Sequence, residues 1–237
     1  MKAIILAAGR SSRLYPLTLD KPKCLLELEK DTSIIEHQID MLRKEGIQDI
    51  IVIVGYLQDM IKNRLGDRVR YRVFNDFAKF NNLHTLYSIK DELNDDIVIL
   101  YSDVVFGKDL LEKCVRSKED FCLLVHNNEV LKNTTRVKIV NEGIVDIGNH
   151  ISVEAGNGNF IGIAKYSRAG IKKLIAEMRK IINDPKHFND YYIVPLINLG
   201  KSGRIGFEFV YDDPWIEIDF LEDYEKAKRL YQKIRDY

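Results

Sequence analysis

The chain has 237 residues, and its 36 lysines and arginines are balanced by 36 aspartates and glutamates. This zero net charge excludes the broad basic surface of a general nucleic-acid-binding protein. A hydrophobic fraction of 46% with 30% charged residues excludes wholesale disorder. No apolar run approaches the length of a membrane span, and the three cysteines lack the spacing of a disulfide framework or a metal site. We therefore expect a cytoplasmic protein with reduced thiols, without membrane insertion and without a nucleic-acid partner.

The N-terminal half alternates short apolar runs with amphipathic segments. The pattern Ser33-x-x-Glu36 predicts a capping box at the start of the first helix. Strands separated by helices of this length indicate a mainly parallel sheet that is covered on both faces. The expected strands are 3–8, 49–54, 70–74, 97–101 and 121–125, and the expected helices are 34–45, 58–65, one starting near 82, and 107–116.

The second half is less regular, and no linker or repeat divides it from the first. Asn141-Glu142-Gly143 between two β-rich runs predicts a hairpin. Apolar residues at helical spacing predict an amphipathic helix over 171–182. A shorter helix is expected at 191–199, short strands at 205–210 and 215–218, and a final helix at 220–234. The pattern predicts one α/β domain with a small mixed α/β insertion.

A cluster of small and basic residues follows the first predicted strand. Small residues at 7–9 let a ligand approach the backbone, and Gly9 can adopt a positive φ, so successive N–H groups there can bind an anion. Arg10, Arg13, Lys21 and Lys23 then place four cations in the following loop. Each of them alone could be an ordinary solvated side chain, but together they indicate a polyphosphate site at the carboxyl end of the strand. Neither a Walker A loop nor GxGxxG is present.

The motif Leu-Ala-Ala-Gly-x-x-x-Arg-Leu-x-Pro-Leu-Thr, followed by Pro-Lys-x-Leu, closely resembles the opening of the nucleotidyltransferases that activate sugar phosphates and small phospho-alcohols. The resemblance implies that Leu6, Ala7, Ala8, Gly9 and Arg10 bind the nucleotide. It implies a catalytic Arg13 holding phosphates and a catalytic Lys23 stabilising the transferring α-phosphate. The chain departs from the pattern at Ser11, where many family members have a second glycine, but serine is small and we expect the loop to survive.

The resemblance also implies a fold of the nucleotide-diphospho-sugar transferase type. This is a Rossmann-like, mostly parallel mixed sheet with helices on both faces. Residues 1–126 would form the nucleotide-binding half of this single domain. Residues 127–237 would form the acceptor-binding half and the C-terminal helix.

Residues 81–88 indicate which subgroup of the nucleotidyltransferases the chain resembles. Their Asn-Asn-x-x-(Ser/Thr)-Leu-Tyr-Ser pattern resembles the bacterial phosphocholine cytidylyltransferases and the related 2-aminoethylphosphonate cytidylyltransferases. In that subgroup Asn82 and Ser88 would supply hydrogen bonds to the base or ribose. The alternative for Asn82 is that it caps the helix that follows.

Asp103 and Asp219 are the candidate metal ligands. Asp103 directly follows a predicted buried strand, and carboxylate oxygens are ligands that Mg²⁺ prefers. Strand alternation puts Glu217 and Asp219 on one face. The alternative for Asp219 is an N-cap pattern with Glu222 before the last helix. The family resemblance implies that an aspartate after the central strand and a second, distant aspartate hold Mg²⁺.

A choline-like acceptor is a bulky cation, which aromatic faces and carboxylates attract. The C-terminal half offers Asp190, Tyr191, Tyr192, Trp215 and Glu217, of which we take Asp190, Tyr192, Trp215 and Glu217 as acceptor-binding residues. Packing in the core is the ordinary alternative for each aromatic residue.

The expected reaction is the Mg²⁺-dependent transfer of CMP from CTP to a small phosphorylated amino-alcohol or aminophosphonate, releasing pyrophosphate. A sugar-1-phosphate nucleotidyltransferase and a non-catalytic nucleotide-binding regulatory subunit are the alternatives. Neither the acceptor nor the oligomeric state follows from the sequence.

Overall fold

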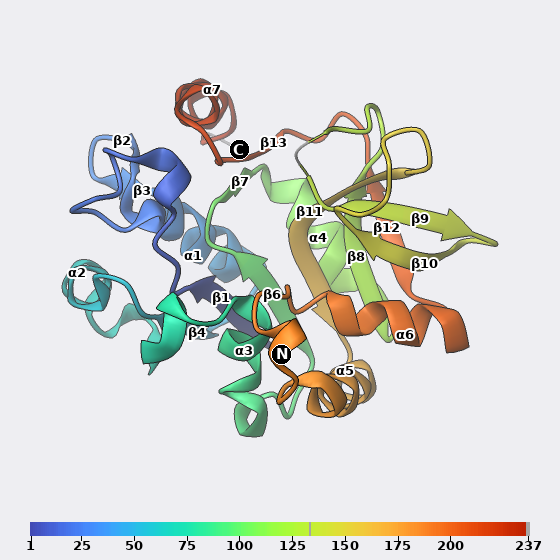
Figure 1. Cartoon of the computed structure of the whole chain (residues 1–237). Helices are drawn as coiled ribbons and strands as arrows, with labels where there is room; N and C mark the ends of the chain where they lie inside the picture. The colour runs from blue at the N-terminus through green and yellow to red at the C-terminus, as the bar shows by residue number, and fades with distance from the viewer. Residues whose placement is uncertain (133, 236–237) are drawn as a thin grey trace.

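The computed structural model describes residues 1–132 and 134–235 (Figure 1). Within these described residues, a mixed sheet of nine strands forms the centre of the structure. The parallel core of this sheet has, in spatial order, β6 (Ile97–Tyr101), β1 (Lys2–Ala7), β4 (Asp49–Val54) and β5 (Arg70–Val73). All of β6 and all of β1 after Lys2 are buried, as expected of parallel strands covered on both faces.

The remaining strands extend the sheet beyond β6. They are β8 (Phe121–His126), β9 (Arg136–Val140), β10 (Gly143–Gly148), β11 (Gly158–Tyr166) and β12 (Gly206–Val210). The long strand β11 runs antiparallel to β6 and pairs on its other side with β8 and β9. The predicted hairpin is β9–β10, which projects from the sheet in Figure 1. Strands from both halves of the chain therefore share one sheet.

Helices cover both faces of the sheet. The helices are α1 (Ile34–Lys44), α2 (Gln58–Leu65), α3 (Asn82–Tyr87), α4 (Lys108–Arg116), α5 (Arg168–Ile181), α6 (Val194–Ser202) and α7 (Leu221–Ile234). Helices α1 and α4 pack together on one face, and α3, α5 and α6 pack together on the other. The predicted α/β architecture is confirmed, and so is the capping box of Ser33 and Glu36 at the start of α1. Among the described residues, no helix has the length and apolar character needed to cross a membrane.

In the part of the chain that the structure describes, two short ribbons lie outside the main sheet. In one, β7 (Val104–Phe106) pairs antiparallel with β13 (Trp215–Glu217). In the other, β2 (Glu27–Glu29) pairs with β3 (Thr32–Ser33). Of these four strands the sequence predicted β13, within a longer expected strand at 215–218. The other three were missed, because two or three residues are too few to show a strand periodicity. The ribbon β7–β13 is the connection that assembles the functional site.

The helix predicted at 191–199 begins instead at Val194. Pro195 explains the shift. Proline is compatible with the first turn of a helix, where its missing N–H has no intrahelical acceptor, but it disrupts later turns. A helix starting at Tyr191 would have placed Pro195 in its second turn.

His37 makes the stability of the fold depend on pH. Its ring, 3% exposed, packs edge-on against Phe106 and Tyr231, and its Nε2 lies 2.8 Å from the Phe106 carbonyl oxygen. Burial lowers the pKa of His37 to about 4. Because the unfolded chain binds a proton near pH 6.5 and the folded chain does not, stability from this group is complete above pH 6.5. It is lost as the pH falls toward 4.

We expect the His37 contribution to reduce the free energy of unfolding by up to about 3 kcal/mol between pH 6.5 and pH 4. Urea unfolding of the wild type and of His37→Gln across this range measures it. Glutamine retains an N–H donor and does not titrate, so the variant should lose less stability on acidification. An identical pH dependence in both proteins would show that another group is responsible.

Candidate active site

A cavity of about 400 Å³ opens where β1 and β6 end. After β5 the chain crosses back over β1 to form β6 on its other side. In open α/β sheets the crevice at such a change of direction is where ligands bind. Among the cavity-lining residues are the turn after β1, the start of α3, the residues after β6 and the residues around β13.

Leu6 and Ala7 at the end of β1, and Ala8 and Gly9 directly after it, border the cavity. A Cβ on Gly9 would meet no atom within 4 Å, so this backbone has open space beside it. The predicted positive φ occurs at Ser11 (52°) and not at Gly9. Glycine adopts this left-handed conformation without strain, which explains the glycine of the family pattern. The loop keeps its turn with serine, and the Thr18 hydroxyl donates to the Ser11 carbonyl at 2.8 Å.

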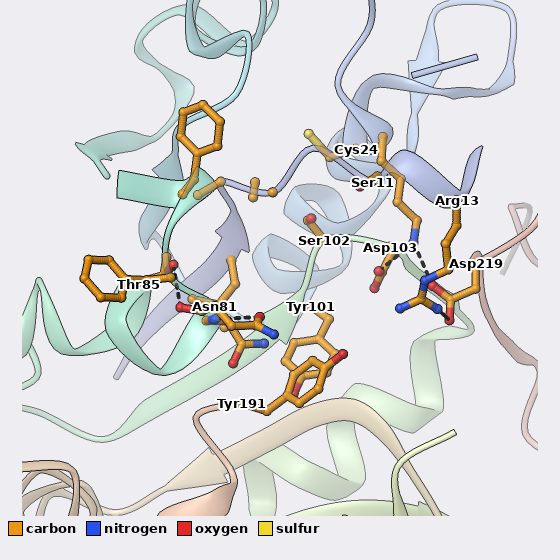
Figure 2. Close-up of a pocket in the computed structure, with 18 of the residues that line it drawn as sticks. Ser11, Arg13, Cys24, Asn81, Thr85, Tyr101, Ser102, Asp103, Tyr191 and Asp219 are labelled. Carbon is orange, nitrogen blue, oxygen red and sulfur yellow. Dashed lines mark hydrogen bonds and ion pairs between the residues drawn. The ribbon is translucent and has the colours of Figure 1, made fainter. Parts of the chain in front are cut away.

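Lys23 and Arg13 direct their charges at carboxylates. The Lys23 Nζ lies 2.8 Å from Asp103 Oδ2 and 3.3 Å from Asp219 Oδ1, with the side chain only 8% exposed. Arg13 Nη1 lies 2.6 Å from Asp219 Oδ2 (Figure 2). Burial alone would lower the pKa of Lys23, but Asp103 and Asp219 outweigh it and raise that pKa above its ordinary value. The two predicted catalytic cations therefore lie together with both predicted metal ligands.

The other two cations of the loop lie elsewhere. Arg10 is exposed, with its guanidinium 5.5 Å from the centre of the Phe77 ring, and it does not line the cavity. Lys21 Nζ lies 3.8 Å from Glu27 Oε1. The predicted nucleotide contact of Arg10 is not supported by this position.

The ribbon β7–β13 brings the carboxylates together. Glu217 is paired with Val104, and the Ile218 N–H donates to the Asp103 carbonyl at 3.0 Å. Ligand oxygens of Asp103, Glu217 and Asp219 all lie within 4.8 Å of one another. Figure 2 shows Asp103 and Asp219 on the same side of the cavity.

The N-cap interpretation of Asp219 is wrong. The carboxylate that caps α7 belongs to Asp223, which accepts hydrogen bonds from the N–H groups of Phe220 at 2.9 Å and Asp219 at 3.2 Å. The side chain of Asp219 is directed to Arg13 and Lys23 instead. Asp219 is thus a site residue whose own backbone is held by the helix cap.

The surroundings of Glu217 shift the pKa of its carboxyl. Burial, together with the charges of Asp103 and Asp219, raises the pKa of Glu217 to about 8. The two cations Lys23 and Arg13 face the two aspartates. The structure places Glu217 among the candidate metal ligands, whereas the sequence predicted contact with the acceptor.

The donor set fits a divalent cation. Asp103 Oδ1 is buried, and no donor among the described residues reaches it, while Oδ2 binds Lys23. A carboxylate oxygen without a partner in a buried site, next to further carboxylates, has the chemistry that suits Mg²⁺. Mg²⁺ at Asp103 and Asp219 stays a prediction, with Glu217 as a third oxygen donor nearby.

Asn82 lines the cavity at the start of α3. Its neighbour Asn81 is the cap, because Asn81 Oδ1 accepts from the Asn82 N–H at 2.7 Å. Asn82 Oδ1 instead accepts from the Tyr192 N–H at 2.7 Å. Ser88 lies at the other end of α3, outside the cavity lining, and its hydroxyl donates to the Thr85 carbonyl at 2.7 Å. A contact of Asn82 with the nucleotide stays a prediction, whereas the position of Ser88 does not support one.

Three of the four predicted acceptor residues lie outside the cavity lining. Asp190 Oδ2 lies 2.6 Å from His187 Nδ1. Tyr192 is fully buried, and its ring centre lies 5.8 Å from that of Tyr101. Trp215 packs on His126.

Sequence reasoning missed much of the remaining wall. Tyr191 lines the cavity in place of Tyr192, since neighbouring side chains point in different directions. Tyr101 also lines it, and its place two residues before Asp103 was the one available signal. The other missed residues are Ser11, Pro22, Cys24, Phe77, Ala78, Lys79, Phe80, Asn81, Thr85, Ser102, Thr134, Thr135, Asn149 and Asn189.

Residues 2–150 match a family model described as nucleotidyl transferase. The chain belongs to the nucleotidyltransferase family. CTP:phosphoglutamine cytidylyltransferase from Campylobacter jejuni is 32% identical over an alignment of 255 residues. The alignment covers 95% of this chain and 98% of the relative. Choline-phosphate cytidylyltransferase from Streptococcus pneumoniae is 46% identical over 240 residues, covering 97% and 98%.

Solved structures agree with this assignment. The structure of CTP:phosphocholine cytidylyltransferase from Streptococcus pneumoniae has a TM-score of 0.81 at 26% identity in the structural alignment, covering 97% of this nucleotidyltransferase and 98% of the other chain. The inositol-1-phosphate CTP transferase from T. maritima shares the fold, with a TM-score of 0.78 at 20% identity over 98% and 97% of the two chains. The family predicted from the opening motif is confirmed.

Proposed function

We propose that this nucleotidyltransferase transfers CMP from CTP to a small phosphorylated or phosphonate acceptor, releasing pyrophosphate. The observation that carries the proposal is the contact of Lys23 with Asp103 and Asp219 at the cavity. A regulatory subunit would not require two cations and a carboxylate cluster held together in this way. Choice of CTP is supported by the two full-length relatives, both of which are named cytidylyltransferases.

The proposed reaction needs no general base. An anionic oxygen of the acceptor forms a bond to the α-phosphorus of CTP, and the bond from that phosphorus to the pyrophosphate oxygen breaks. Catalysis is then a matter of positioning and of neutralising charge. The turn at Leu6–Gly9 would bind the triphosphate, and Lys23 and Arg13 would neutralise its charge. We propose that Asp103 and Asp219 hold Mg²⁺, which when bound supplies further charge neutralisation on phosphate oxygens.

We propose an acceptor that carries a nitrogen-bearing group beside its phosphate. The two curated relatives are named for phosphoglutamine and for choline phosphate, and both of these contain such a group. Tyr191 offers an aromatic face in the cavity, and Glu217 offers a carboxyl group close to the aspartates.

The test measures pyrophosphate release with each of four nucleoside triphosphates. The acceptors are phosphocholine, phosphoglutamine, 2-aminoethylphosphonate, phosphoethanolamine and several sugar-1-phosphates, each with Mg²⁺ and with EDTA. We expect release with CTP and a nitrogen-bearing acceptor, and none with EDTA. Release with a sugar-1-phosphate alone would instead identify a sugar-activating enzyme. Nucleotide binding without release across the panel would favour the regulatory subunit.

A further inference from the structure

Arg136 is a buried cation at the start of β9, and its side chain binds backbone carbonyls. It is 7% exposed, and no carboxylate among the described residues forms an ion pair with it. Its Nη1 donates to the carbonyls of Leu131 at 2.9 Å and Lys132 at 2.6 Å. Its Nη2 donates to the Asn149 carbonyl at 2.7 Å, and its Nε donates to the Ile151 carbonyl.

These four carbonyls belong to two segments at the open end of the β9–β10 hairpin, one before β9 and one after β10. A buried guanidinium is stable only when its donors are satisfied. Because backbone carbonyls of both segments satisfy them here, this one side chain joins the two segments. Asn159, which is fully buried, reinforces the first segment by accepting from the Leu131 N–H at 2.9 Å and the Thr134 hydroxyl at 2.8 Å.

The segments held by Arg136 carry part of the cavity wall. Thr134, Thr135 and Asn149 line the same cavity as Asp103. The turn at Leu6–Gly9, assigned above to the triphosphate, is a different part of the wall. Thr134, Thr135 and Asn149 are therefore candidates for contact with the acceptor.

We propose that Arg136 is a positioning residue that fixes the acceptor-binding wall of the cavity and so determines the KM for the acceptor. This inference rests on the proposed function. Arg136 itself does not line the cavity, so it acts through Thr134, Thr135 and Asn149.

The test compares steady-state kinetics of the wild type, Arg136→Met and Arg136→Lys. In Arg136→Met we expect the KM for the acceptor to rise about 10- to 100-fold, the scale on which a small displacement of a binding group acts, while the KM for CTP changes by less than about threefold. Lysine can reach some of the carbonyls, so Arg136→Lys should recover part of the loss. Trypsin should cleave after the exposed Lys132 faster in Arg136→Met than in the wild type.

Lys165→Met is the matched control. Lys165 on β11 is 4% exposed, and its Nζ also binds carbonyls, those of Ser117 at 2.8 Å and Glu119 at 3.2 Å. None of these three residues is among the described residues that line the cavity. We expect Lys165→Met to lower the melting temperature but to leave the acceptor KM unchanged.

An unchanged acceptor KM in a folded Arg136→Met protein would overturn the proposal. So would an equal rise in Lys165→Met, because the effect would then be general loosening. If Arg136→Met does not fold, the same comparison is made with Arg136→Lys. If the wild type releases no pyrophosphate with any pair of substrates, the proposed function fails. The proteolysis experiment is independent of activity, so unchanged cleavage after Lys132 in Arg136→Met would separately contradict a positioning role of Arg136.

Discussion

Asp103→Asn is expected to lower kcat by about 10²- to 10³-fold while the protein remains folded. Asparagine retains the size of the side chain and one oxygen but removes the negative charge. In the structure one carboxylate oxygen of Asp103 binds Lys23, and the other is buried without a donor among the described residues. The substitution therefore removes the charge beside the proposed metal position and weakens the positioning of Lys23. Folding should persist, because Lys23 keeps Asp219 as a partner.

Asp213→Asn is the control for this substitution. The Asp213 side chain is 16% exposed against 20% for Asp103, and it also forms an ion pair with a lysine, at 2.7 Å from Lys113. It does not belong to the described residues that line the cavity. Pyrophosphate release and thermal unfolding are measured for both variants. A kcat for Asp103→Asn within about threefold of the Asp213→Asn value would contradict the role of Asp103, since loss of one charge stabiliser acts on a far larger scale.

Features that could be predicted are those determined by neighbours in the chain. Leu6–Gly9 spans the end of the buried strand β1, and Asp103 lies two residues after the buried strand β6, so the position of each strand end places these residues at the cavity. The capping box at Ser33 and the bounds of β4 and α2 are also local, and they match the structure.

Features that could not be predicted depend on contacts between distant segments. The carboxylate cluster needs the pairing of β7 with β13, two short strands far apart in the sequence. The acceptor wall needs Arg136 to join two segments of a hairpin. At residues 191 and 192 the error was one of direction, because no local pattern says which tyrosine faces the cavity.

Lys23→Met is expected to impair both catalysis and stability. The ammonium is the shared partner of Asp103 and Asp219, and removing it leaves these carboxylates, with Glu217, close to one another in a largely buried site. Loss of one partner from a buried pair destabilises proteins by about 3–5 kcal/mol, and loss of a charge stabiliser lowers kcat by about 10²- to 10³-fold. We expect effects of both sizes here, measured by urea unfolding and by pyrophosphate release.

Mg²⁺ separates the two roles of Lys23. In the wild type a cation added to the cluster competes with the ammonium for Asp103 and Asp219, whereas in Lys23→Met it does not. Binding to the folded state alone stabilises a protein. Mg²⁺ should therefore raise the melting temperature of Lys23→Met more than that of the wild type, yet leave its kcat low. Lys165→Met, which also loses a buried lysine, should show neither the larger response to Mg²⁺ nor the loss of kcat. Equal responses to Mg²⁺ in all three proteins would show that the carboxylate cluster does not bind the ion, and a normal kcat in Lys23→Met would remove Lys23 from the mechanism.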